Sequence, residues 1–270
     1  MKILALDFDG VIVDSALECL FTSYNAYFKI YKHKDKDFFG GKLFTFENWK
    51  DIKKDYPKGI VNFIKKRPYI RGANDYGLII KLMEEKKIIN NQKEFDKYRK
   101  SVDFDFETFH REFYKERDRL QELDFKAWIN LEPSYPKIVE GIKKLLESGT
   151  KIIITTSNRL KSIAPSFTRS YLGFEIKKED ILDMRFGEDK SEQMKHIVKS
   201  HNIQFEEIYF IDDQVSHLIQ TKPLGVKVLL AGWSYATDIQ KKEALKQNIP
   251  IIEKEEDFYK IVKNSLNEKV

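Results

Sequence analysis

The pattern of hydrophobic and polar positions divides the chain into two kinds of sequence. From about residue 133 to the C-terminus, short apolar runs alternate with stretches whose apolar residues recur at helical spacing. The apolar runs are continuous, which is typical of strands that are buried on both faces of a parallel sheet. This alternation predicts an α/β fold in which helices cover both faces of a parallel sheet.

The individual elements of this part can be placed from the same pattern. We predict strands at 2–6, 151–155, 181–186, 208–211 and 226–230, and helices at 137–148, 160–172, 192–201, 214–221 and 257–266. Ser191 is expected to be the N-cap of the helix 192–201, because a serine hydroxyl can accept a hydrogen bond from the first turn.

Residues 16–132 have a different pattern, dominated by aromatic and charged positions. We predict helices at 16–31, 60–66, 74–87 and 106–123, and we find no convincing strand there. We therefore expect an α/β core formed by residues 1–15 and 133–270, with an all-helical domain, 16–132, inserted after the first strand as a cap. A segment in that place would lie over the carboxyl ends of the strands, where open α/β sheets bind ligands, and could exclude water from the site.

Composition adds limits on partners and location. The 270 residues include 48 Lys and Arg against 43 Asp and Glu, a net charge of +5. Because the two signs are interspersed, we expect a solvated surface and no nucleic-acid partner, although a mildly positive surface would attract a phosphorylated substrate. Cys19 is the only cysteine, so an internal disulfide is impossible. The chain shows no signal-peptide pattern and no apolar stretch of membrane-spanning length, and we expect a cytoplasmic protein without a membrane partner.

The first strand leads directly into two aspartates and a glycine. Asp7 and Asp9 are spaced i, i+2, and Gly10 follows at once. A carboxylate at the end of a buried strand is costly unless it serves a cation or a reaction. This pattern therefore indicates a metal-dependent chemical site.

Three further polar clusters follow predicted strands. These are Thr155-Thr156-Ser157-Asn158, the segment 187–190 that ends in Lys190, and Asp212-Asp213. Since the carboxyl ends of parallel strands lie at one edge of a sheet, we expect the clusters to converge there. Together they supply the carboxylates, hydroxyls and lysine that phosphoryl transfer requires.

General chemistry suggests a role for each group. Mg²⁺ prefers oxygen ligands and is bound by a few carboxylates, so Asp7 with Asp212 or Asp213 could hold it. Asp7 is a candidate nucleophile that would form an aspartyl-phosphate, and Asp9 a candidate general acid and base. Lys190 offers a positive charge to the transferring phosphoryl group.

The phosphate oxygens need hydrogen-bond donors. The hydroxyl of Thr156 and the backbone N–H groups around Ser157 and Asn158 could supply them. Each cluster also has a purely structural interpretation: Thr156 could be a helix cap, Lys190 a surface lysine, and Asp213 a cap, which makes Asp212 the preferred metal ligand of the pair. In the inserted segment, Lys42, Arg67 and Arg71 are conceivable substrate contacts, but we favour solvated surface charge for each.

The four clusters, in this order, resemble the four motifs of the haloacid dehalogenase-like (HAD) superfamily. The segment Asp7-Phe8-Asp9-Gly10-Val11-Ile12-Val13-Asp14-Ser15 resembles the opening of its phosphoglycolate phosphatase and β-phosphoglucomutase-like branch. The resemblance implies a Rossmann-like core with a helical cap after the first motif. It also implies that the backbone carbonyl of Asp9 is a metal ligand, that Thr156 (or Thr155, in the alternative register) binds phosphate, and that Asp212 and Asp213 form the acidic pair of the fourth motif.

The expected function is that of a Mg²⁺-dependent phosphomonoesterase acting on a small phosphorylated metabolite. A phosphomutase would use the same core residues, and a non-catalytic binding protein could keep the same fold. The sequence leaves the identity of the substrate and the oligomeric state open.

Overall fold

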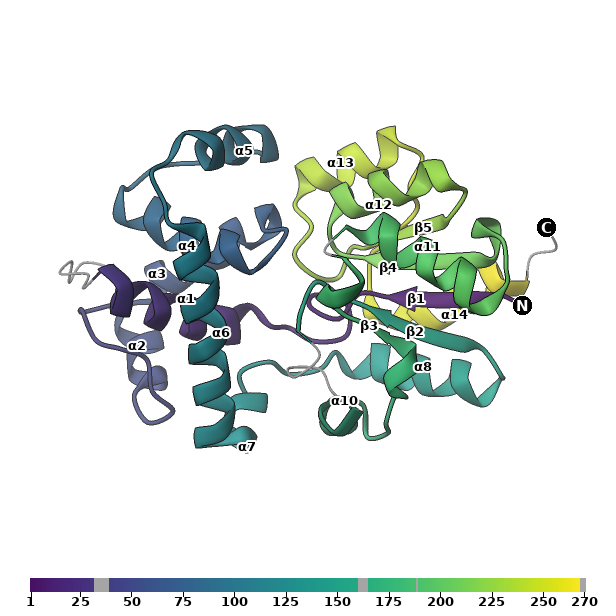
Figure 1. The fold of residues 1–270 in the computed structure, drawn as a ribbon, viewed down its shortest axis with the longest axis horizontal. Coiled ribbons are helices and arrows are strands. Elements are labelled where there is room, and N and C mark those ends of the chain that lie inside the picture. The colour runs from purple at the N-terminus through teal and green to yellow at the C-terminus, as the bar shows by residue number, and fades with distance from the viewer. Residues whose placement is uncertain (32–38, 160–164, 188, 268–270) are drawn as a thin grey trace. The chain divides into compact units, whose positions relative to one another are not determined.

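The computed structural model describes residues 1–31, 39–159, 165–187 and 189–267 (Figure 1). Its contacts divide the chain into two compact units. Met1–Asp14 with Pro133–Val270 is called the sheet unit here, and Ser15–Glu132 the inserted unit. The two ends of the inserted unit leave the sheet unit side by side, because the backbone N–H of Asp14 donates to the carbonyl of Pro133 at 2.8 Å.

The sheet unit is built on six parallel strands. They are β1 (Ile3–Leu6), β2 (Lys151–Thr155), β3 (Ile181–Leu182), β4 (Ile208–Asp212), β5 (Lys227–Ala231) and β6 (Ile251–Ile252), in the spatial order β3-β2-β1-β4-β5-β6. The first strand of the chain is therefore interior, with Ile3 opposite Lys151 of β2 on one side and Ile208 of β4 on the other. This architecture confirms the predicted α/β fold with a parallel sheet.

Helices cover both faces of this sheet, as Figure 1 shows with α12 and α13 on one side and α8 on the other. The helices of the unit are α8 (Pro136–Glu147), α10 (Pro165–Leu172), α11 (Lys190–His201), α12 (Val215–Thr221), α13 (Asp238–Lys246) and α14 (Phe258–Asn267). Short 3-10 turns lie at Lys178–Asp180, Met184–Phe186, Phe205–Glu207, Lys222–Leu224 and Glu255–Asp257.

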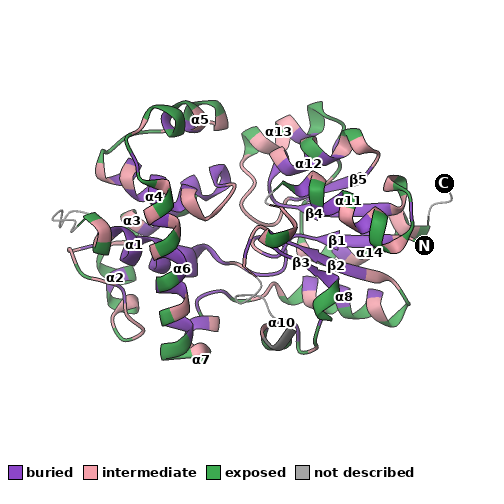
Figure 2. Ribbon diagram, viewed as in Figure 1, coloured by how far each residue is buried: buried purple, intermediate pink, exposed green. Residues whose placement is uncertain are grey.

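Alternate residues of each strand reach opposite faces. Ala5 and Phe210 pack with Met194 of α11 and Leu218 of α12 in one apolar cluster. On the other face α8 packs closely against α14, since a Cβ atom at Gly141 would lie only 2.5 Å from the ring of Phe258. The strands are accordingly buried over most of their length, as Figure 2 shows, which explains why their sequences are largely apolar.

The structure corrects two of the sequence predictions for this unit. The predicted strand 181–186 ends at Leu182, and a 3-10 turn at Met184–Phe186 follows it because the Asp183 side chain accepts from the Arg185 backbone N–H. Helix α11 begins at Lys190, and its N-cap is Asp189, whose carboxylate accepts from the backbone N–H of Ser191. Helix α13 and strand β6 were not predicted. Residues 160–164 of the predicted helix 160–172 lie outside the described residues.

The secondary structure of the inserted unit, over its described residues, consists of helices joined by turns and loops. Its helices are α1 (Ala16–Tyr31), α2 (Trp49–Asp55), α3 (Pro57–Lys66), α4 (Ala73–Glu84), α5 (Gln92–Ser101), α6 (Phe106–Leu123) and α7 (Phe125–Ile129), with a 3-10 turn at Arg67–Tyr69. Aromatic rings fill its interior, for example Phe21 stacked on Phe44 at 4.5 Å and Tyr76 stacked on Phe113 at 5.6 Å between ring centroids.

Two buried carboxylates of the inserted unit are held by cations. The guanidinium of Arg117 on α6 donates from Nε to Oε1 of Glu18 on α1 at 2.9 Å and from Nη2 to Oε2 at 2.5 Å, with both side chains almost fully buried. Glu116 is paired with Lys29 of α1 and with Arg119. The pairs Glu18–Arg117 and Lys29–Glu116 connect α1 to α6, as does the hydrogen bond from Nδ2 of Asn25 to Oε1 of Glu116 at 2.9 Å.

Charge is unevenly distributed between the two units. The inserted unit carries 25 Lys and Arg against 20 Asp and Glu, whereas the remainder of the chain carries 23 of each. The whole net charge of +5 therefore resides in the inserted unit. None of the helices among the described residues combines the length and the apolar character that crossing a membrane requires.

Candidate active site

The predicted site residues of the sheet unit lie at the carboxyl ends of its strands. Asp7 follows β1 directly, and its backbone N–H extends the ladder by donating to the carbonyl of Ile211 at 2.9 Å. Asp212 is the last residue of β4, and Asp213 comes next. Thr156 follows β2, and its backbone N–H donates to the carbonyl of Leu182 at 2.9 Å. The hydrogen bonds of the sheet thus fix the position of these polar residues relative to the ends of the neighbouring strands.

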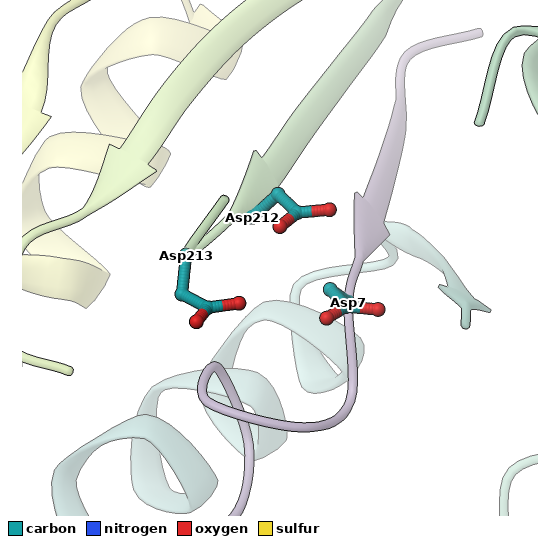
Figure 3. A group of neighbouring side chains, drawn as sticks. All are labelled: Asp7, Asp212 and Asp213. Carbon is teal, nitrogen blue, oxygen red and sulfur yellow. The ribbon is translucent and has the colours of Figure 1, made fainter. Parts of the chain in front are cut away.

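Three carboxylates meet at this edge. Asp7, Asp212 and Asp213 are each at least nine-tenths buried, and one oxygen from each lies within 4.8 Å of the other two. Figure 3 shows the three side chains turned toward a common space between the ends of β1 and β4. Such a group is unfavourable without a compensating cation.

Lys190 supplies one positive charge. This side chain is 1% exposed, and its Nζ donates to Oδ1 of Asp7 at 2.8 Å and to the backbone carbonyl of Thr155 at 2.7 Å. Its Nζ also lies 3.9 Å from Oδ2 of Asp212. As the first residue of α11, Lys190 is placed by the turn that leads from β3 into this helix.

One lysine does not neutralise the cluster. Burial raises the pKa of the Asp7 carboxyl to about 6; the charge of Lys190 opposes this effect, and the charge of Asp212 adds to it. For Asp212, burial alone would raise the pKa of the carboxyl, but His217 and Lys190 together lower it below its usual value. Asp212 is therefore an anion at neutral pH, and Asp7 is held near its titration point.

Asp212 is held at both oxygens. The backbone N–H of Gln214 donates to Oδ1 at 2.7 Å, and Nδ1 of His217 lies 2.9 Å from Oδ2. His217 belongs to α12, the helix that follows β4, and the turn between them brings its ring back to the strand end.

Asp9 and Gly10 form the loop after β1. The carboxylate of Asp9 accepts a hydrogen bond at Oδ2 from Nδ2 of Asn158, at 3.3 Å. Gly10 has φ +82°, and a Cβ there would lie 2.7 Å from Cγ of Asp213. A side chain at position 10 would thus displace one of the clustered carboxylates, which explains the glycine.

The loop after β2 contains the predicted phosphate-binding groups. Oγ1 of Thr156 accepts from the backbone N–H of Asn158 at 2.9 Å. Thr155 points into the interior, and its backbone carbonyl binds Lys190. Ser157 is half-buried, and its side chain makes no hydrogen bond within the described residues. The loop is tied down by the buried Gln193, whose Nε2 donates to the carbonyls of Thr156 and Gly187, both at 2.9 Å.

Sequence reasoning did not identify two residues that support this site. Gln193 binds backbone carbonyls, and such a role leaves no signature in a single sequence. His217 could have been suspected, because it lies in the first turns of the helix that follows Asp212-Asp213. In the inserted unit, Arg71 is bound by both carboxylate oxygens of Asp96, at 2.7 and 2.8 Å, which gives it a partner within that unit.

The acidic cluster fits a hard divalent cation. Its donors are carboxylate oxygens from Asp7, Asp212 and Asp213, the ligand type that Mg²⁺ binds in proteins. Lys190 alone leaves the three carboxylates with excess negative charge, and the pKa of Asp7 is raised by its burial and, to a smaller extent, by the charge of Asp212. The donor set and the charge balance both suit a divalent cation.

A match to a known protein family agrees with the presence of these polar groups at the strand ends. A family model described as haloacid dehalogenase-like hydrolase matches residues 1–219. No curated protein matches the sequence.

Several solved structures share the fold at low identity. A predicted phosphatase of Clostridium acetobutylicum is 13% identical, with a TM-score of 0.60 and coverage of 97% of this chain and 98% of that chain. A predicted phosphoglycolate phosphatase of Haemophilus somnus is 17% identical, with a TM-score of 0.58 and the same coverage of both chains. A HAD family hydrolase of Deinococcus radiodurans, with bound phosphate and sodium, is 12% identical, with a TM-score of 0.54 and coverage of 98% and 96%.

The family model spans β1 to α12, so it includes all four polar clusters at the strand ends. Matching well over half of the chain, it establishes what the motifs suggested: the chain belongs to the haloacid dehalogenase-like hydrolase family.

Proposed function

We propose that this hydrolase is a Mg²⁺-dependent phosphomonoesterase that acts on small phosphorylated metabolites through an aspartyl-phosphate on Asp7. The observation that carries the proposal is the buried cluster of Asp7, Asp212 and Asp213 with Lys190 donating to Asp7. The phosphate and the predicted phosphatase activities named for similar folds are consistent with it.

The nucleophile would be one particular oxygen of Asp7. Lys190 holds Oδ1, and within the described residues no hydrogen bond reaches Oδ2, so Oδ2 is the atom that can approach phosphorus. In the first step a bond forms between Oδ2 and phosphorus, and the bond from phosphorus to the alcohol oxygen of the substrate breaks.

Asp9 would move the protons. Its carboxyl group gives a proton to the departing alcohol oxygen and then takes one from the water that attacks the aspartyl-phosphate. That second attack breaks the bond between phosphorus and Asp7, releases inorganic phosphate and restores the free carboxylate. Asn158, which donates to Asp9, would hold the acid in place between the two steps.

Charge on the phosphoryl group has to be balanced. Lys190 and the N–H groups of the loop after β2, with the Thr156 hydroxyl, would face the phosphoryl oxygens. A Mg²⁺ ion bound by Asp7, Asp212 and Asp213, and by the backbone carbonyl of Asp9, would supply the positive charge that offsets repulsion between the phosphate and the attacking carboxylate. We propose that the inserted unit serves as the cap that selects the substrate, and its net positive charge suits anionic metabolites.

The test is hydrolysis of an aryl phosphate by the purified protein in the presence of Mg²⁺. We expect activity that excess EDTA abolishes, and a loss of at least about a thousandfold in kcat for Asp7→Asn. The matched control is Asp238→Asn, the same change at an exposed residue of α13, which should retain wild-type activity.

Two outcomes would contradict the proposal. Activity that survives Asp7→Asn would rule out an aspartyl-phosphate intermediate on Asp7. Activity that survives excess EDTA would rule out dependence on a metal ion. Isomerised sugar phosphate in place of released phosphate would identify a phosphomutase instead.

A further inference from the structure

His217 is a buried polar residue to which the proposed mechanism gives no role. Its side chain is largely buried in the first turns of α12, and Nδ1 lies 2.9 Å from Oδ2 of the fully buried Asp212. Asp212 and His217 are five residues apart, so the end of β4 and the His217 ring on α12 lie on either side of one tight turn.

The direction of this hydrogen bond follows from the chemistry of Asp212. An ionised carboxylate can only accept, so the proton lies on Nδ1 of His217, which donates. The tautomer of His217 is thus assigned by its neighbour.

The bond fixes the orientation of the Asp212 carboxylate. Gln214 holds one oxygen through its backbone N–H at 2.7 Å, and His217 holds the other. Rotation of the carboxylate about its Cβ–Cγ bond would break both contacts. The carboxylate plane is therefore set relative to Lys190, whose Nζ lies 3.9 Å from the oxygen that His217 binds, and relative to Asp7 beyond it.

Two donors do not exhaust the capacity of this carboxylate. Its two oxygens offer about four lone-pair sites, so each oxygen that already accepts one hydrogen bond can still face a cation. Partners of this kind, which bind a ligand residue from behind, typically change metal affinity or activity by about 10- to 100-fold when they are removed.

We infer that His217 is a positioning residue for the magnesium site: its Nδ1–H holds Asp212 in the orientation in which that carboxylate joins Asp7 and Asp213 around the cation. The inference rests on the proposed function, since it presupposes that this cluster binds Mg²⁺. His217 itself would touch neither substrate nor metal.

A matched pair of amide variants separates positioning from packing. In His217→Asn the side-chain amide nitrogen can take the place of Nδ1 and donate to Asp212. In His217→Gln the amide reaches the region of Nε2 and cannot. Both replacements are uncharged and polar, so each leaves a comparable polar group in the same buried space, while His217→Ala removes it entirely.

The experiment is a Mg²⁺ titration of each full-length variant, followed by the rise in Tm and repeated by calorimetry, with no substrate present. We expect the midpoint for Mg²⁺ to rise by about 10- to 100-fold in His217→Gln and His217→Ala. His217→Asn should stay within about threefold of wild type, because it restores the donor.

The outcomes are distinguishable from a failure of the proposed function. If wild type shows no response to Mg²⁺, the metal-dependent function falls and this inference with it. If wild type responds and all the variants bind Mg²⁺ equally well, His217 is a packing residue and only the inference is wrong. Should His217→Ala fail to fold, the Asn and Gln variants still decide, because a purely structural role predicts no difference in their Mg²⁺ midpoints.

Discussion

The Asp7 carboxyl can bind either a proton or a metal ion. It is buried beside two other carboxylates, and its pKa of about 6 in the metal-free protein means that a moderate fall in pH would protonate it. Lys190 limits this rise in pKa but does not cancel it. The proposed nucleophile is therefore kept ionised at neutral pH by a narrow margin.

This margin predicts that protons compete with Mg²⁺. Below pH 6 the folded protein binds a proton at Asp7, and a metal ion must displace it, so Mg²⁺ affinity should fall by about tenfold for each pH unit below 6 and level off above pH 7. Calorimetric titrations at pH 5, 6, 7 and 8 would measure this change, with proton release in weak buffer as a second readout. Equal affinity at pH 5 and pH 7 would contradict the prediction.

A second prediction concerns the role of Asp9 as general acid. Because a poor leaving group needs its proton more than a good one, Asp9→Asn should lower kcat/KM for an alkyl phosphate by about 100- to 10,000-fold and for p-nitrophenyl phosphate by much less. Steady-state assays of both substrates, with the same variant and the same Mg²⁺ concentration, provide the comparison. An equal loss on both substrates would mean that Asp9 acts by binding or folding.

At this scale the sequence revealed residues whose type is unusual for their place. Carboxylates at the end of an apolar strand are costly, so Asp7 and Asp212 could be recognised as a candidate site, and the structure has them side by side. Residues that support the site are of ordinary type for a helix. Gln193 could not be distinguished from a solvent-facing residue until the fold showed which way it points, and for His217 the only signal was its place in the helix that follows Asp212-Asp213.

Elements were predictable where a long pattern had a single interpretation. The helix predicted at 106–123 is α6 in the structure, and the strand at 151–155 is β2. Errors occurred where local hydrogen bonding decided the outcome: Asp183 ends β3 early by capping a turn, and Asp189 caps α11 in place of Ser191. The two-residue strand β6 is too short to leave a pattern and exists only because it pairs with β5.

A prediction at the scale of elements concerns the buried ion pair between α1 and α6. Replacing either partner, as in Glu18→Met or Arg117→Met, leaves an unpaired buried charge and should lower the free energy of unfolding by about 3–5 kcal/mol. The double variant buries two apolar side chains and should lose less than either single variant.

Equilibrium unfolding of the full-length protein in urea, followed by far-UV circular dichroism, would measure the three free energies. Lys195→Met, which removes an exposed pair with Glu192 on α11, is the control and should change stability by at most about 1 kcal/mol. Additive losses in the double variant would show that Glu18 and Arg117 act independently.

In the whole molecule, the residues proposed for catalysis and the segment proposed for substrate selection belong to different units. The whole acidic cluster lies in the sheet unit, whereas the inserted unit contributes the entire net positive charge. The split was visible in the sequence because the hydrophobic period changes near residues 14 and 133. The packing inside the inserted unit was not, because its aromatic residues occur in every helix and fit many arrangements.

If the units are energetically independent, Mg²⁺ should stabilise only one of them. At a Mg²⁺ concentration a hundred times its Kd, the free energy of unfolding of the unit that binds the ion would rise by about 2.7 kcal/mol. Hydrogen–deuterium exchange with and without Mg²⁺ should therefore show slower exchange in β1 and β4 and unchanged exchange in α1 and α6. Equal slowing in all four elements would show that the two units unfold as one.

The interior place of β1 has a consequence for biosynthesis. Its neighbours, residues 151–155 and 208–212, are translated long after it, and at roughly 5–20 residues per second the second of them emerges on the order of ten to forty seconds later. The inserted unit is contiguous in sequence and can fold during this interval, while an apolar strand that ends in Asp7 waits without a partner. On the ribosome, a nascent chain of this family member therefore exposes the strand that precedes the proposed nucleophile, and we expect a chaperone to bind that strand.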